Sequence, residues 1–211
     1  MLVDLERRIV LFTPPKCGTL TLHEVLPRFG ARPILGPQFD TDVGEHTTLL
    51  PNDVWREVDR FRFVVATRNP YTRAASLFGH YTRYWRPPHL AFPEFVEQIV
   101  VAPRHLFFNA TIAAILEPLE SPLDGRRPLR VDSFVRLEAL ADDLRRLGYD
   151  ARGALPRVHA LAHRGVAEYT AEARQRIETW ARHDFDRFGY SRELARAAEP
   201  GRDGLAESGT G

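Results

Sequence analysis

Cysteine, methionine and lysine are nearly absent from this chain of 211 residues. It holds one Cys and one Met, and among its 29 Lys and Arg residues the only lysine is Lys16. A single cysteine, Cys17, excludes a disulfide within the chain and a zinc site built from several cysteines. A GC-rich coding sequence produces such a bias toward arginine, so the position of the one lysine needs a separate explanation.

A charge excess and long apolar runs are missing as well. The formal net charge is +1, whereas general nucleic-acid and membrane-surface binders carry a large basic excess. The first apolar run, Ile9–Phe12, is far too short for the core of a signal peptide or for a membrane span. We therefore expect a cytoplasmic protein with neither a nucleic-acid nor a membrane partner.

What is present is the composition of one globular domain. Hydrophobic residues make up 44% of the chain, which is enough for a sizeable core at this length. From about residue 195 onward the sequence becomes rich in Gly, Glu and Ser. We predict one domain over residues 1–194 and a disordered tail over residues 195–211.

Three units of the chain share one plan, in which a short apolar run precedes an amphipathic segment. Strands that alternate with helices predict βαβ units, so we expect an α/β fold with a central parallel sheet flanked by helices. The runs lie at 8–13, 61–67 and 129–135, and the segments at 19–29, 71–85 and 136–148. Further helices are predicted at 51–58, at 92–117 in two pieces divided by Pro103, and at 170–188, with a short strand at 32–36.

The break after the first run, "TPPKCGT", has the features of an anion-binding turn. Ligands of open α/β sheets bind beyond the carboxyl ends of the strands. Gly18 permits a tight turn, which leaves the N–H groups of Gly18, Thr19 and Leu20 uncommitted at a helix start. Lys16 adds a positive charge and Thr19 a hydroxyl. The alternative is an ordinary strand–helix junction with an exposed lysine. Walker A does not fit, because its lysine follows the second glycine, whereas Lys16 precedes Gly18.

Cys17 raises the alternative of a thiol-dependent phosphatase. A cysteine at a helix N-terminus can have a lowered pKa and act as a nucleophile. The phosphatase loop, however, requires an arginine six residues after the cysteine, and that position is His23. We therefore expect a packed or merely exposed thiol at Cys17.

The break after the second run, "TRNPYTR", is the second candidate for an anion site. Arg68 closes the strand, Ser76 follows two helical turns later, and Arg73 lies between them. The planar fork of arginine suits a phosphate, and serine supplies a short donor to the same group. The alternative is a surface arginine with a serine inside a helix.

The two breaks together resemble the sulfotransferases that use 3′-phosphoadenosine-5′-phosphosulfate (PAPS). The stretch "TPPKCGTLTL" resembles their 5′-phosphosulfate loop, and "RNPYTRAASLFGHY" resembles their 3′-phosphate motif. The stretches "FVRLEALADDLRRLGY" and "YTAEARQRIETWARHDFDRFGYS" are similar to later segments of the carbohydrate-type, usually Golgi-membrane, branch. The resemblance covers residues 8–190 and implies a P-loop NTPase-like three-layer sandwich, here in a soluble, bacterial-like member.

The resemblance implies a role for each matching residue. Lys16 would contact the bridging oxygen between the 5′-phosphate and the sulfuryl group. Arg68 and Ser76 would bind the 3′-phosphate, and no metal would be required. The 5′-phosphate would lie in the cradle formed by Pro15, Lys16, Cys17, Gly18, Thr19 and Leu20. The chain departs from the family pattern at the second proline of "TPPKCG" and at His159, where the family often has Asn.

The acceptor hydroxyl must lose a proton during transfer, so a His or Glu is expected near the sulfur. We select His46, in "GEHTTLLPNDVW", because many carbohydrate-type members carry a stretch resembling K-H-x-[TS] at about this place. Glu45 is the second choice, and a loop or helix-capping histidine is the structural alternative. The full set of candidates is His23, Glu24, Glu45, His46, His80, His105 and His163.

The sequence thus predicts a sulfotransferase that moves the sulfuryl group of PAPS to a hydroxyl of a sugar or natural product. Two alternatives stay open. A nucleotide-dependent kinase would need Mg²⁺ ligands and a loop for a γ-phosphate. A nucleotide-binding domain of the same fold would bind without turnover.

Overall fold

The computed structural model describes most of the first 193 residues of the chain. The described residues are 1–34, 54, 56–84, 90–101, 110–120, 128–151, 153, 155 and 169–193. The predicted tail at 195–211 lies outside them, as does Pro103, at which the helical region 92–117 was expected to divide. Half of the predicted helix at 51–58, residues 51–53 and 55, lies outside as well.

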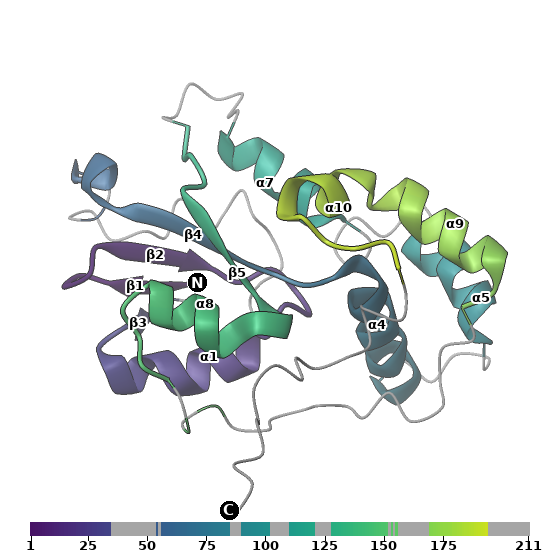
Figure 1. Ribbon diagram of the computed structural model, residues 1–211, viewed down its shortest axis with the longest axis horizontal. Coiled ribbons are helices and arrows are strands. Elements are labelled where there is room, and N and C mark those ends of the chain that lie inside the picture. The colour runs from purple at the N-terminus through teal and green to yellow at the C-terminus, as the bar shows by residue number, and fades with distance from the viewer. Residues whose placement is uncertain are drawn as a thin grey trace, which may run out of the picture.

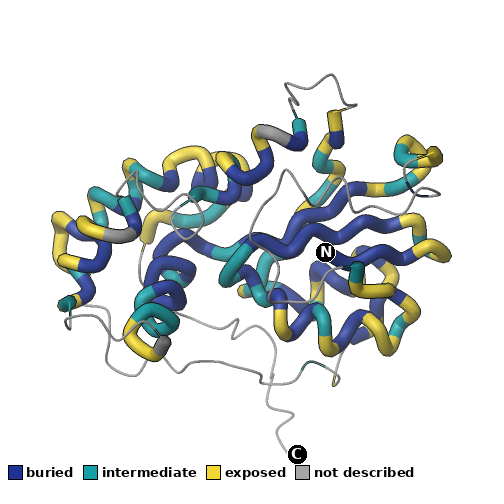
Figure 2. The backbone as a smooth tube through the Cα atoms, turned by 180° about the vertical axis from the view of Figure 1, so that it is seen from behind, coloured by how far each residue is buried: buried dark blue, intermediate teal, exposed yellow. Residues whose placement is uncertain are grey.

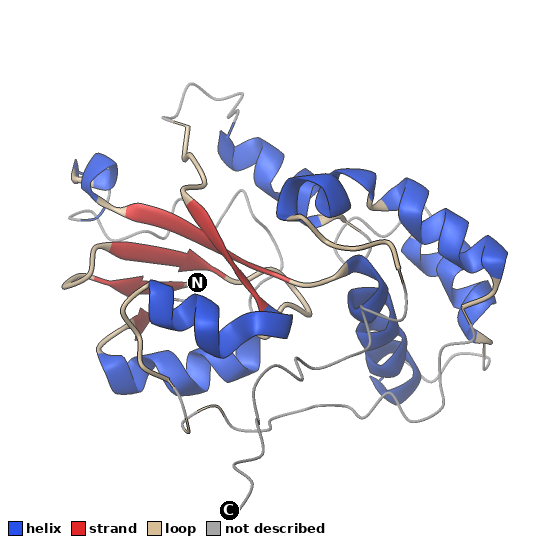
Figure 3. Cartoon of the chain, in the orientation of Figure 1, coloured by secondary structure: helices blue, strands red, loops and turns tan. Residues whose placement is uncertain are grey.

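A five-stranded mixed sheet forms the centre of the fold (Figures 1 and 3). Its strands, in spatial order β3-β1-β2-β4-β5, are Arg32–Pro33, Leu2–Asp4, Ile9–Phe12, Arg62–Thr67 and Ser133–Arg136. β2 pairs with β4 and β4 pairs with β5 in parallel, with Leu11 opposite Val64 and Val65 opposite Phe134. The three apolar runs therefore form the adjacent parallel strands that the sequence predicts.

The prediction of a wholly parallel sheet was wrong at the other edge. β1 pairs antiparallel with both β2 and β3, so the chain begins with a hairpin. The charge in "LVD" obscures this strand, but the carboxylate of Asp4 is buried and satisfied. It accepts hydrogen bonds from the Arg7 guanidinium (3.0 Å) and the Tyr149 hydroxyl (2.9 Å). A paired carboxylate of this kind can be buried in a strand.

Helices lie on both sides of the strands in Figure 1. α1 (Thr19–Val25) follows β2, and α4 (Pro70–Tyr84) follows β4. β5 leads through a 3₁₀ turn, Leu137–Ala139, into α8 (Leu140–Arg146). The predicted helix at 170–188 is broken at Ala181, whose φ of −103° and ψ of 24° are not helical. The remaining helices are α5 (Phe92–Phe95), α7 (Ile112–Glu120), α9 (Ala171–Trp180) and α10 (Arg182–Phe188). α5 continues in a π-helical turn, Val96–Val100. Two more 3₁₀ turns span Leu26–Phe29 and Val58–Arg60.

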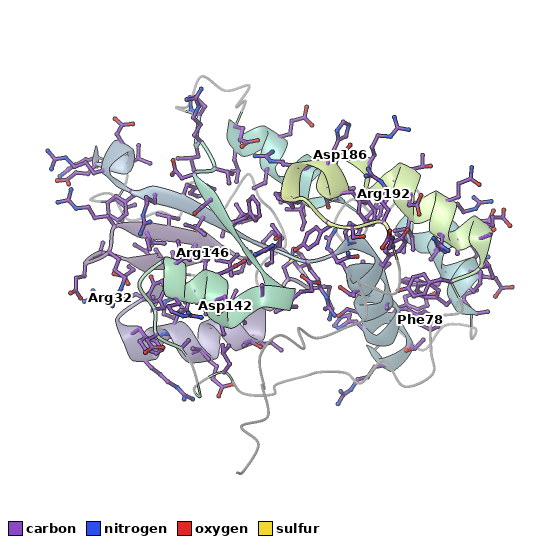
Figure 4. The ribbon with its side chains drawn as sticks, viewed as in Figure 1. Arg32, Phe78, Asp142, Arg146, Asp186 and Arg192 are labelled. Atoms are coloured by element: carbon purple, nitrogen blue, oxygen red, sulfur yellow. The ribbon has the colours of Figure 1, made fainter. Side chains whose placement is uncertain are left out.

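Two hydrophobic cores divide the molecule. The first contains the buried strands, dark blue in Figure 2, with residues of α1, α7 and α8. The second joins α4, α5, α9 and α10, which gather beyond the carboxyl end of β4 in Figure 1. There Phe78, labelled in Figure 4, packs its ring 5.5 Å from Phe92 and 5.2 Å from Phe95. α4 thus links the end of the parallel strands to a separate helical layer.

None of the helices in the described part of the chain has the length and apolar character needed to cross a bilayer.

Candidate functional site

The turn between β2 and α1 is held in an uncommon backbone conformation. Lys16 has a φ of 66° and Gly18 a φ of 85°, both in the left-handed region that L-residues rarely adopt. The N–H of Cys17 donates to the Pro14 carbonyl at 3.2 Å, and α1 begins with the bond from Leu22 N to Gly18 O at 2.9 Å. The amides of residues 18–20 therefore precede the helical ladder, as an anion-binding turn requires.

Gly18 is fixed by its neighbour as well as by its backbone. A Cβ at Gly18 would lie 2.7 Å from Cδ1 of Leu137, which comes from the 3₁₀ turn after β5. A larger residue would therefore require the Leu137 side chain to move, in addition to straining its own left-handed φ. The third strand–helix junction thus packs directly on the first.

Thr19 and Cys17 face the protein in this turn. The Thr19 hydroxyl donates toward the carbonyls of Thr13 and Pro14, at 3.4 and 3.3 Å. A hydroxyl has one proton, so in this geometry Thr19 offers an anion its backbone N–H. Cys17 is buried, and burial raises its pKa to about 12, against the opposing charges of Arg73 and Arg68. This thiol is protonated at neutral pH, which is unfavourable for the nucleophilic role.

Two arginines connect the turn between β4 and α4, the second turn, to the turn between β2 and α1, the first turn. Arg68 Nη1 donates to the Lys16 carbonyl at 3.1 Å, and its Nε donates to Thr72 Oγ1 at 3.1 Å. Arg73 Nε donates to the Pro15 carbonyl at 3.3 Å. The two turns that the sequence singled out therefore lie side by side at the carboxyl edge of β2 and β4, joined through the backbone of residues 15 and 16.

Arg73 lies at the centre of this connection and is fully buried. Its Nη1 donates to the Ala110 carbonyl at 2.9 Å, and its guanidinium carbon lies 5.9 Å from the ring centroid of Trp180. Its Nη2 is buried and has no hydrogen-bond partner among the residues that the structure describes. Burial raises the pKa of Asp184, and the positive charge of Arg73 opposes that rise. The buried guanidinium of Arg73 therefore connects the first turn to α7, α9 and α10.

The side chains around the turns give the site a positive potential. Burial lowers the pKa of Lys16, and the charge of Arg68 lowers it further. Partial burial lowers the pKa of His80 on α4, and the charge of Lys16 adds to that effect. The neutral imidazole of His80 therefore lies within electrostatic reach of Lys16. Ser76, one helical turn before His80, is buried at 6% exposure.

A network around Glu138 was missed by sequence reasoning. The Asn69 N–H donates to Glu138 Oε1 at 2.9 Å, and the Thr72 hydroxyl lies 3.0 Å from the same oxygen. The Tyr190 hydroxyl is 2.9 Å from Thr67 Oγ1, at the end of β4. In "RLEAL" a glutamate looks like a solvent-facing helix residue, and only the parallel pairing of β4 with β5 brings it to the second turn.

The proposed base and its alternative, His46 and Glu45, lie outside the described residues, as do His105, His159 and His163. Their roles stay predictions. Among the residues that the structure does describe, no cluster of three or more His, Cys, Asp or Glu side chains is placed to hold a metal ion. Comparisons of the chain with protein-family models, with curated proteins and with solved structures found no match.

Proposed function

We propose that the chain is a PAPS-dependent sulfotransferase with a P-loop NTPase-like arrangement of its parallel strands. One observation carries the proposal. The two turns whose sequences resemble the 5′-phosphosulfate loop and the 3′-phosphate motif are neighbours, and Arg68 Nη1 donates to the Lys16 carbonyl at 3.1 Å. One nucleotide that presents both of its phosphate groups to adjacent loops requires such proximity of the two turns.

Different residues of the site would bind different parts of the nucleotide. Backbone N–H groups of Gly18, Thr19 and Leu20 would hold the 5′-phosphate, and Arg68 with Ser76 the 3′-phosphate. Lys16 would stand at the bridging oxygen, where negative charge develops as the sulfuryl group departs. In the transfer, the bond from sulfur to the bridging oxygen breaks while a bond to the acceptor oxygen forms in line. A sugar or natural-product hydroxyl is the proposed acceptor.

The acceptor proton requires a base, and His46 is our proposal for it. His46→Ala should lower kcat by about 100-fold or more while the affinity for 3′-phosphoadenosine-5′-phosphate (PAP) stays unchanged. The measurement is steady-state transfer of a labelled sulfuryl group, with PAP titration calorimetry beside it. Turnover near the wild-type level would assign the proton to another group, with Glu45 and His80 as the variants to test next.

The 3′-phosphate separates this proposal from its alternatives. PAP should bind about 10- to 100-fold more tightly than AMP, since charge-assisted hydrogen bonds to the 3′-phosphate are absent for AMP. Thermal shift and calorimetry with PAP, AMP and ATP with Mg²⁺ measure this preference. Ser76→Ala should reduce the affinity for PAP and leave that for AMP unchanged.

A chain that binds PAP and AMP equally would contradict the sulfotransferase proposal. A preference for ATP with Mg²⁺ would favour the kinase alternative. Tight PAP binding without any transfer, across a panel of hydroxyl acceptors, would favour the nucleotide-binding domain.

A further inference from the structure

Glu138 is an acidic residue that contacts the proposed 3′-phosphate turn at its backbone and at Thr72. The 3₁₀ turn after β5 carries it to the carboxyl edge of the sheet, beside the β4–α4 junction. Its Oε1 accepts the Asn69 N–H at 2.9 Å and lies 3.0 Å from Thr72 Oγ1. The carboxylate thereby holds both the entrance to α4 and a side chain of its first turn.

Arg68 interacts with this carboxylate in two ways, through a hydrogen-bond chain and through charge. Thr72 Oγ1, which contacts Glu138, also accepts from Arg68 Nε at 3.1 Å, so the three groups form one chain. Directly, burial lowers the pKa of Arg68, and the negative charge of Glu138 opposes that lowering. The cation proposed to bind the 3′-phosphate therefore already has an anionic neighbour.

We propose that Glu138 is a positioning residue with two effects on the 3′-phosphate subsite: its oxygen fixes the β4–α4 turn, and its charge weakens the hold of Arg68 on a phosphate. The inference rests on the proposed function, because it assigns a role within the same site. A phosphate that reaches Arg68 must compete with a carboxylate that shares the cation and repels the newcomer. Glu138 thus limits nucleotide affinity, which favours release of the bisphosphate product.

The oxygen and the charge of Glu138 can be separated by substitution. Glu138→Gln keeps an amide oxygen that can accept from Asn69 N–H and Thr72, but it removes the charge. Glu138→Ala removes both. Because Glu138 is exposed to solvent, its repulsion is screened, and a gain in PAP affinity of about three- to tenfold is expected for the Gln variant. The Ala variant should lose that gain, since the turn loses its acceptor.

Asp132→Asn is the matched control. Asp132 Oδ2 accepts the Phe63 N–H at 2.6 Å near the start of β4. It thus supports the backbone there as Glu138 supports the turn after the end of β4. Six residues of extended chain separate Phe63 from Asn69, or about 20 Å, which exceeds a Debye length of about 8 Å at physiological ionic strength. This variant should leave the affinity for PAP unchanged.

The experiment is calorimetric titration of the full chain and its variants with PAP and with AMP, at 50 and 300 mM salt. Support requires that the Gln variant bind PAP more tightly than wild type, that AMP be unaffected, and that the gain shrink at high salt. A purely structural role would not alter the ratio of PAP to AMP affinity.

Each contrary result has a distinct meaning. A wild-type chain that does not distinguish PAP from AMP overturns the proposed function, and this inference falls with it. If wild type does prefer PAP, an unchanged or weakened Gln variant overturns the inference alone. An Ala variant that binds PAP as tightly as the Gln variant overturns the positioning effect and leaves the charge effect standing.

Discussion

Lys16→Arg should bind PAP with nearly wild-type affinity and transfer the sulfuryl group about 100- to 1,000-fold more slowly, the loss typical of a misplaced charge at a developing oxyanion. Lysine is a compact point charge that can approach a single bridging atom, whereas the guanidinium is a broad planar fork. The space is also restricted, because Lys16 is half-buried, and burial and the charge of Arg68 already lower its pKa. A second guanidinium beside Arg68 cannot occupy the same point.

The substitution isolates the side chain from the backbone. Lysine and arginine have the same Cβ, so both bear the same strain at a φ of 66°. Thermal unfolding should therefore be nearly unchanged in the variant. The measurement pairs single-turnover transfer from labelled PAPS with calorimetric titration of PAP. Comparable transfer rates in the two proteins would make the one lysine of this chain an accident of composition.

Arg73→Met should destabilise the fold by about 3–5 kcal/mol, the range for removing one member of a buried charged network. Methionine has a similar length but cannot donate to the Pro15 and Ala110 carbonyls that Arg73 now satisfies at 3.3 and 2.9 Å. Arg73→Lys keeps the charge but lacks the fork that reaches both carbonyls, so an intermediate loss is expected. Because Pro15 precedes Lys16, transfer should fall as well.

The loss should depend on pH, because burial raises the pKa of Asp184 and Arg73 opposes that rise. Without the arginine that pKa rises further above its unfolded value. A carboxyl whose pKa is higher in the folded than in the unfolded state makes its full contribution to stability below the unfolded-state pKa. That contribution is lost as the pH rises through the folded-state pKa. The deficit of the Met variant should therefore be smaller near pH 4 than at pH 7.

Urea unfolding at both pH values measures this deficit. Arg182→Met, at an exposed position of α10, is the control and should change stability by no more than about 0.5 kcal/mol. A loss below about 1 kcal/mol for Arg73→Met at pH 7 would show that the buried guanidinium is not the link between the turns and the helical layer.

The sequence predicted the parts of the fold that depend on local pattern. Apolar runs identified β2, β4 and β5, and the breaks after two of them identified Lys16, Gly18 and Arg68 as candidate site residues. Strand β1 was missed because Asp4 looks like a polar break in the sequence until its partners Arg7 and Tyr149 are known.

The parts that sequence reasoning missed depend on contacts between distant segments. Glu138 reaches Asn69 across 69 positions of the chain, and Arg73 reaches Ala110 across 37. The Thr19 hydroxyl looked like a ligand donor, but its proton is directed at the Thr13 and Pro14 carbonyls, just after β2. Periodicity and motif spacing contain no information on such partners.

The left-handed backbone of Lys16 has a consequence for selection. An L-residue in this conformation costs about 1–2 kcal/mol, which glycine would avoid at a smaller entropic penalty of about 0.5–1 kcal/mol. Arg8, with a φ of 53° in the β1–β2 hairpin, bears the same strain far from either turn. A library selected for folding alone should drift toward glycine at both positions, whereas a library selected for turnover should drift at Arg8 and keep lysine at 16. A lysine kept at 16 only under the second selection would mark a position where stability is given up for the proposed activity.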